Sequence, residues 1–209
     1  FENYNTKISS FMSEYGFQSF PEYSTFKKFA KKKDEDMYSK VMKSHQRSSI
    51  GNATIEEYMA REFKTPKDFE SLLYLSQLLQ ADGIQTAIEA HRRNKATCMG
   101  SLYWQLNDCW PGASWSSIDY YGKWKALHYK VRNAFSPVIV SHEFVDSNLQ
   151  ISIISDLIDS FSGEVEVTCL PFKGDSFLKK WTKEIDLKPL EASTVLSILK
   201  NQIPPNSYL

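Results

Sequence analysis

The hydrophobic pattern of this chain changes near Pro137. Before that point, apolar residues recur at the three- and four-residue spacing of amphipathic helices. After it, short apolar or alternating runs are separated by Asp, Ser, Gly and Pro, which is typical of an antiparallel β-sandwich. The sequence therefore predicts two domains of different class, α/β in residues 1–136 and all-β in residues 137–209.

Three segments before the boundary carry signals for the start of a helix. Thr54 and Glu57 have the spacing of a capping box, which predicts a helix that begins at Thr54. Thr65 and Pro66 place a cap residue before a proline at the first helical position, and the pattern after them predicts a long helix ending near Arg92. A shorter helix is predicted to begin at residues 21–22.

Apolar runs at residues 7–13 and 98–105 predict two strands on either side of these helices, and a further helix is predicted at about residues 124–134. Strand, helices, strand and helix in this order indicate a parallel β/α arrangement. Ligands bind at the carboxyl ends of parallel strands. We therefore expect Glu14 and residues 104–107 to lie on one rim.

Composition excludes several classes of partner. The chain has 25 basic and 25 acidic residues, and this balance argues against nucleic acid and against a membrane surface as partners. No run reaches the roughly 20 apolar residues of a membrane-spanning helix. The three cysteines and four histidines lack the spacing of a zinc site, so no metal is expected. The N-terminal residues lack a signal-peptide pattern and look like a position inside a longer chain, so no compartment can be read from a leader.

Four of the five tryptophans lie between residues 104 and 124, interleaved with polar residues. One interpretation is an aromatic core, which composition alone favours. The other is a wall for a ligand with an apolar face and a polar rim, such as a sugar, because Trp and Tyr suit half-wet pockets. Both interpretations stay open on composition.

Glu14 follows the first predicted strand, where an isolated Glu is most often an exposed loop residue. Its surroundings, Ser-Glu-Tyr-Gly-Phe-Gln at residues 13–18, closely resemble the nucleophile motif of β-mannosidases of glycoside hydrolase family 2. Further similar segments follow in the same order as in that family, at residues 45–52, 89–94, 100–111 and 114–129. The resemblance is dense over residues 8–137 and weak beyond them.

The resemblance implies a retaining exo-β-mannosidase, which removes terminal β-D-mannose from an oligosaccharide or glycoconjugate through a covalent glycosyl-enzyme. It implies that Glu14 is the nucleophile and that Trp104 is the platform under the sugar. Asn107, Asp108 and Trp110 are expected to bind substrate on the same rim. No metal or organic cofactor is needed for this chemistry. The compartment implied is periplasmic, secreted or lysosomal.

The same resemblance implies the last two β/α units of a (β/α)8 TIM barrel, followed by an incomplete Ig-like β-sandwich. The family's acid/base Glu precedes the nucleophile and has no convincing counterpart here, so we expect the chain to need the remainder of the same polypeptide and to be inactive alone. The alternatives are a sister activity, β-galactosidase or β-glucuronidase, and a non-catalytic carbohydrate-binding or structural fragment. The amino-acid sequences of residues 13–18 and 106–111 favour the mannosidase.

Overall fold

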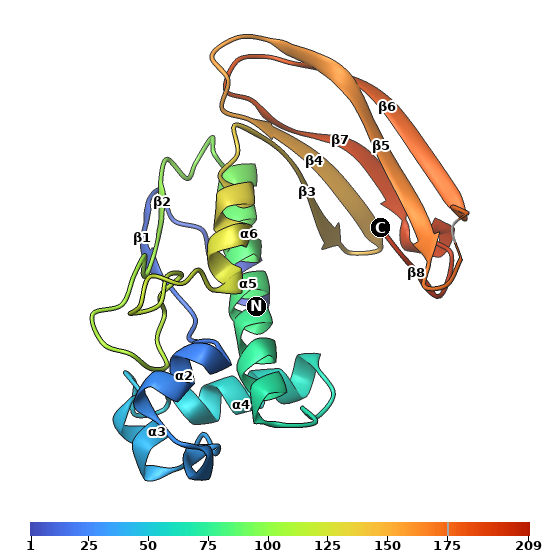
Figure 1. Cartoon of the computed structure of the whole chain (residues 1–209). Coiled ribbons are helices and arrows are strands. Elements are labelled where there is room, and N and C mark those ends of the chain that lie inside the picture. The colour runs from blue at the N-terminus through green and yellow to red at the C-terminus, as the bar shows by residue number, and fades with distance from the viewer. Residues whose placement is uncertain (175) are drawn as a thin grey trace. The chain divides into compact units, whose positions relative to one another are not determined.

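The computed structural model describes residues 1–174 and 176–209, which form two compact units (Figure 1). The first unit comprises Phe1–His91 and Thr97–Phe135, and the second comprises Arg92–Ala96 and Ser136–Leu209. Each unit has its own cluster of buried apolar side chains. None of the helices in the described part of the chain is long and apolar enough to cross a membrane.

Most of the regular secondary structure of the first unit is helical, and two short strands pair with each other. The strands, β1 (Met12–Tyr15) and β2 (Ser101–Tyr103), are parallel. The helices are α1 (Glu2–Thr6), α2 (Tyr23–Phe29), the 3-10 helix η1 (Lys32–Asp34), α3 (Lys40–Ser44), α4 (Gly51–Glu62), α5 (Phe69–Arg93, of which the last two residues belong to the second unit) and α6 (Ala126–Ala134).

The two strands of the first unit are shorter than predicted, and the first lies further along the chain. The prediction of a buried strand over residues 7–13 was wrong, since most of that run is exposed and regular pairing begins at Met12. A strand needs a partner for its backbone groups, and the ladder with β2 supplies one only for Met12 to Tyr15. Glu14 therefore lies within β1.

The start of α4 was also predicted wrongly. The helix begins at Gly51, and Thr54 lies inside it, where its hydroxyl donates to the carbonyl of Ile50. Tertiary contacts explain the earlier start, because Asn52 in the first turn is buried and its amide donates to the carbonyl of Met37 at 2.5 Å. Long-range hydrogen bonds thus outweigh the local capping signal.

The long helix α5 is confirmed, with a later start than Thr65 suggested. The carboxylate of Asp68 accepts a hydrogen bond from the backbone amide of Ser71 at 2.7 Å, which satisfies a free N–H of the first turn. The helix then runs without a break through Gly83. It is the longest element of the first unit and provides one wall of its core.

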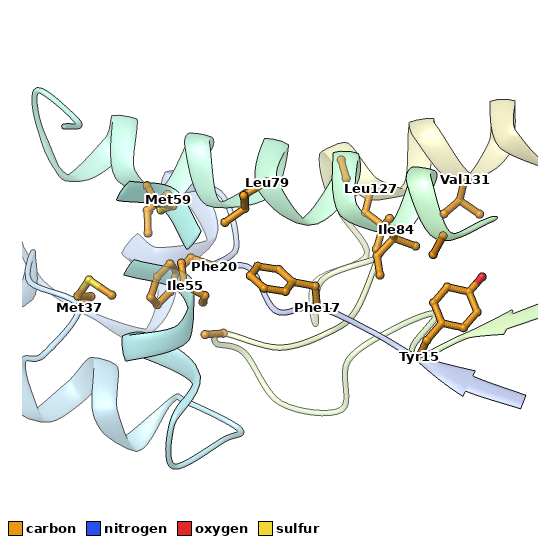
Figure 2. Packing of buried hydrophobic residues seen from close by; sticks show 14 of the residues in the cluster. Tyr15, Phe17, Phe20, Met37, Ile55, Met59, Leu79, Ile84, Leu127 and Val131 are labelled. Atoms are coloured by element: carbon orange, nitrogen blue, oxygen red, sulfur yellow. The ribbon is translucent and has the colours of Figure 1, made fainter. Parts of the chain in front are cut away.

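The core of the first unit forms where α5 meets the segment that follows β1 (Figure 2). Leu79 and Ile84 of α5 are buried, as are Phe17 and Phe20 after the strand, and α6 contributes Leu127. Burying a side chain of this size contributes about 1.5–3 kcal/mol. This packing fixes the chain just beyond the carboxyl end of β1.

The second unit is a sandwich of two antiparallel sheets. Its strands are β3 (Val138–Val145), β4 (Asn148–Ser155), β5 (Phe161–Pro171), β6 (Lys179–Leu187), β7 (Ala192–Leu199) and β8 (Ser207–Tyr208), arranged as β3-β4-β7 and β6-β5-β8. Inward side chains of both sheets meet in one buried cluster, including Leu149 and Ile153 of β4 and Val165 of β5. The short alternating runs in the sequence predicted antiparallel sheets here, and this prediction is confirmed.

Truncating Leu149 tests this core. Its side chain is fully buried, so Leu149→Ala should lower the free energy of unfolding by about 2–5 kcal/mol. The control is Ile158→Ala, at a side chain that is 79% exposed, where we expect a change within about 0.5 kcal/mol. Urea unfolding followed by circular dichroism measures both, and equal midpoints for the two variants would refute this assignment of the core.

Candidate active site

The carboxyl ends of β1 and β2 lie side by side. Tyr15 pairs with Tyr103, and the backbone amide of Trp104 donates to the carbonyl of Tyr15 at 2.7 Å. The chains are so close that a Cβ added at Gly16 would lie 2.4 Å from the carbonyl oxygen of Trp104. Only glycine fits there without a shift of the backbone. Glu14 and Trp104 thus come from adjoining ends of two paired strands.

Both of these side chains are accessible to solvent. Successive side chains of a strand point to opposite faces, so Glu14 is directed away from the buried Tyr15 and is exposed. The Trp104 indole is 47% exposed. The peptide bond that follows Trp104 is cis. An open carboxylate and a half-open aromatic ring are therefore available at the ends of these strands.

On its buried side, β1 is held by a set of neutral groups. The Tyr15 hydroxyl lies 2.7 Å from Ser101 Oγ, which in turn lies 2.8 Å from Nδ1 of His91. Burial raises the pKa of the Tyr15 hydroxyl and lowers the pKa of the His91 imidazole. Both shifts favour the uncharged forms, so this side of the strand is fixed without a buried charge.

Asp108 lies in the loop after β2 but faces inward. Its side chain is 8% exposed, and its Oδ2 accepts hydrogen bonds from the hydroxyls of Ser114 at 2.7 Å and Ser116 at 2.6 Å. Asn107 beside it is exposed, and its carbonyl accepts from the side-chain amide of Gln105 at 3.0 Å. The two residues predicted together thus lie in different surroundings, one inside the loop and one on its surface.

Lys125, a fully buried lysine packed against this loop, was not predicted from the sequence. Its Nζ donates to the carbonyls of Ser19 and Ser114, each at 3.4 Å. Burial lowers the pKa of Lys125 to about 8, while the charges of Asp108 and Asp119 act in the opposite direction. Lys125 precedes the first residue of α6, outside the periodic pattern, so no hydrophobic periodicity marks it as buried.

Of the two interpretations of the tryptophan cluster, the aromatic core does not hold for three of the four residues. Trp104 and Trp110 are each 47% exposed, and Trp124 is 44% exposed. Trp115 is only partly buried. This exposure fits the alternative interpretation, a half-wet aromatic wall. The Trp110 ring additionally stacks on the imidazole of His45, with ring centroids 5.1 Å apart.

Two surface hollows of the first unit lie away from Glu14 and Trp104. The first, of about 640 Å³, is lined by residues 35–38, by residues of α4 and of its connection to α5, and by the start of α5. The second, of about 740 Å³, is lined mainly by residues of α2, α5 and α6. Neither is lined by Glu14 or Trp104. Within residues 1–174 and 176–209, no group of three His, Cys, Asp or Glu side chains is placed to hold a metal ion.

No family model matches the chain, but related proteins do. A β-mannosidase of Capra hircus is 39% identical over 142 residues, which cover 62% of this chain and 16% of the relative. β-Mannosidase A of Emericella nidulans is 31% identical over 208 residues, covering 84% of this chain and 22% of the relative. The chain is a homologue of β-mannosidases.

Solved structures agree with this homology. The crystal structure of the β-D-mannosidase from Dictyoglomus thermophilum matches with a TM-score of 0.84 at 33% identity, over 94% of this chain and 24% of that one. The exo-chitosanase CsxA of Amycolatopsis orientalis matches with a TM-score of 0.74 at 20% identity, over 88% of this chain and 23% of that one, a likeness of fold. The resemblance read from the motifs is thereby confirmed, and the chain spans about a sixth to a quarter of the β-mannosidases it matches.

Asp108 gives a test of the buried charges. Asp108→Asn removes one of the two carboxylates that offset the Lys125 ammonium. It also replaces one of two accepting oxygens by an NH2 group, so that either the serine hydroxyls or the Gln105 amide lose their acceptor. We expect the free energy of unfolding to fall by about 3–5 kcal/mol near neutral pH. Glu62→Gln, at an exposed position, is the control and should stay within about 0.5 kcal/mol. Urea unfolding of both variants checks this, and an unchanged Asp108→Asn midpoint would contradict it.

Proposed function

We propose that this chain carries part of the active site of a retaining exo-β-mannosidase, which hydrolyses terminal non-reducing β-D-mannose residues. The observation that carries the proposal is that an exposed Glu14 carboxylate and a half-exposed Trp104 indole come from adjoining strand ends in a β-mannosidase homologue. The substrate would be a β-mannoside oligosaccharide or glycoconjugate.

In this mechanism Glu14 attacks the anomeric carbon of the mannose. A second carboxylic acid protonates the leaving oxygen and then activates the water that hydrolyses the glycosyl-enzyme. A nucleophile of this kind has to reach the sugar as an ionised carboxylate, and the exposure of Glu14 supports that role. No metal or organic cofactor enters the proposed reaction.

The other site residues divide by their surroundings. Trp104 would stack against the apolar face of the sugar, because indole offers a broad apolar surface next to polar groups. Asn107 and Trp110, both exposed on the loop after β2, would add a hydrogen bond and a second aromatic surface. Asp108 would support substrate binding through the loop that its serine hydrogen bonds hold in place.

The acid/base residue is proposed to come from the remainder of the same polypeptide. Retaining glycosidases place their two carboxyl groups about 5–5.5 Å apart. Asp108 and Asp119, the acidic side chains of the loop after β2, are buried, and both accept hydrogen bonds from hydroxyl groups. Neither is thereby available as the second carboxyl group.

The architecture proposed for the whole follows the same homology. Residues 1–136 would form the last two β/α units of a (β/α)8 barrel, and residues 137–209 part of an Ig-like β-sandwich. The parallel pairing of β1 with β2, with helices between and after them, supports the first assignment. Two strands cannot close a barrel, because closure needs a complete ring of paired strands.

Replacing Glu14 tests the proposed role. In the complete product of the gene, Glu14→Gln keeps the shape of the side chain but removes the anionic nucleophile, so turnover of a chromogenic β-mannoside should fall by several orders of magnitude. Glu62→Gln, a matched change at an exposed position, should leave turnover unchanged. Trapping with a 2-fluoro-mannoside and peptide mapping should place the sugar on Glu14, and label on a different carboxylate would refute the assignment.

The same assay separates the alternatives. Turnover of β-galactosides or β-glucuronides in preference to β-mannosides would favour a sister glycosidase. Absence of all glycosidase activity in the complete gene product would favour a non-catalytic carbohydrate-binding or structural role.

We further expect the 209-residue chain alone not to hydrolyse β-mannosides, because it lacks a convincing second carboxyl group. The purified chain is assayed with a chromogenic β-mannoside, and the complete gene product serves as the positive control. Turnover by the chain at the level of the complete product, abolished by Glu14→Gln, would show that both catalytic groups lie within these residues.

A further inference from the structure

Three rings from separate parts of the first unit form a stack that ends at Trp110. The imidazole of His45 lies 4.2 Å from the Phe29 ring at 17°, and 5.1 Å from the Trp110 ring at 21°, measured between centroids and ring planes. The imidazole therefore covers one face of the indole. Because Trp110 is the last ring of the stack and is 47% exposed, its remaining surface stays open.

The imidazole is held in this orientation by a hydrogen bond. Nδ1 of His45 lies 2.5 Å from the carbonyl oxygen of Pro111. A carbonyl oxygen can only accept, so Nδ1 carries the proton and donates it. The bond joins the His45 ring to the residue that directly follows Trp110, so ring and indole are linked both by stacking and through the backbone.

The backbone around His45 forms hydrogen bonds with the loop that carries Trp110. The carbonyl of His45 accepts from the amide of Ala113 at 2.9 Å, and the amide of Arg47 donates to the carbonyl of Ala113 at 3.2 Å. Gly112 has a φ of 153°, and a Cβ added there would lie 1.9 Å from the carbonyl oxygen of His45. The two segments approach so closely that neither can shift without the other.

We propose that His45 is a positioning residue for Trp110, which orients the indole so that its open surface meets a ring of the bound carbohydrate. The identity of this ligand rests on the proposed function, whereas the positioning of the indole does not. His45 itself does not touch the ligand in this proposal, and it acts through the indole. Simple packing would also bring the rings together, so the test has to follow Trp110 itself.

Two substitutions separate the ring from the hydrogen bond. His45→Asn keeps a side-chain donor for the Pro111 carbonyl but removes the aromatic ring. His45→Phe keeps a ring to stack on Trp110 but removes the donor. His142→Asn, at an exposed position in the second unit, is the matched control.

The readout is the indole N–H resonance of Trp110 in the 209-residue chain labelled with 15N-tryptophan, assigned by its loss in Trp110→Phe. In His45→Asn the Trp110 resonance should shift, and its order parameter should fall below about 0.6, a value of flexible groups. His45→Phe should retain most of the order, and the resonance of Trp104 should be unchanged throughout. An unchanged Trp110 order parameter in His45→Asn overturns the proposal.

If His45→Asn loses the dispersion of all five indole resonances, Phe29→Leu carries the same test, because it removes only the ring behind the imidazole. Loss of order confined to Trp110 then supports the proposal, and undiminished order overturns it.

Kinetic measurements on the complete gene product test whether Trp110 contacts the carbohydrate. His45→Asn should raise KM for a β-mannoside by about two- to tenfold with a smaller change in kcat, as expected for a weakened aromatic contact, and His45→Phe should partly restore KM. An unchanged KM overturns the contact between Trp110 and the carbohydrate. If the wild-type product hydrolyses no β-mannoside, the proposed function fails, while the indole order parameters still decide the role of His45.

Discussion

The hydrogen bond from the Trp104 amide to the Tyr15 carbonyl is the link on which the candidate site depends. It joins the ends of a four-residue and a three-residue strand, and so short a pair is not stable in isolation. Its position is set by what lies around it, because Tyr15 is anchored to Ser101 and the following Phe17 packs into the core against α5. The accessible Glu14 is therefore carried by a strand whose other face is fixed.

Lys125 shows a second constraint, because its buried ammonium fixes the alignment of two backbone segments. Ser19 and Ser114 exchange two backbone hydrogen bonds, at 2.9 and 3.1 Å, and the Lys125 ammonium donates to both of their carbonyls. It thereby ties the segment after β1 to the segment after β2. Removing such a charge from water costs several kcal/mol, so the group adds little to stability. The Lys125 ammonium instead specifies one alignment of the two segments, since any shift of one segment along the other would leave this buried charge without its hydrogen-bond acceptors.

The sequence predicted those elements whose periodicity is set by a single buried face. It located α5 and α6 and indicated the antiparallel strands of the second unit because their apolar residues repeat along the element itself. It failed at β1 and at the start of α4, where the boundary is decided by partners distant in the sequence, such as Gly100 for Met12 and Met37 for Asn52. Glu14, Trp104 and Asn107 were predicted from motifs, and their roles stay predictions. Lys125 and the contact of His45 with Trp110 depend on tertiary approach and leave no local pattern.

Exposed indoles need a physical reason, because each leaves a large apolar surface in water. Apolar groups rimmed by polar residues mark places where a ligand or partner binds, and around Trp104 and Trp110 the rim is supplied by Gln105 and Asn107. The backbone of Trp104 is fixed by its hydrogen bond to Tyr15, and the Trp110 ring stacks on His45. A ligand that stacks on rings already held in place loses less conformational entropy than one that must first order them. In the proposed site, a contact that orients an indole from behind, as His45 does for Trp110, would therefore contribute to binding without touching the ligand.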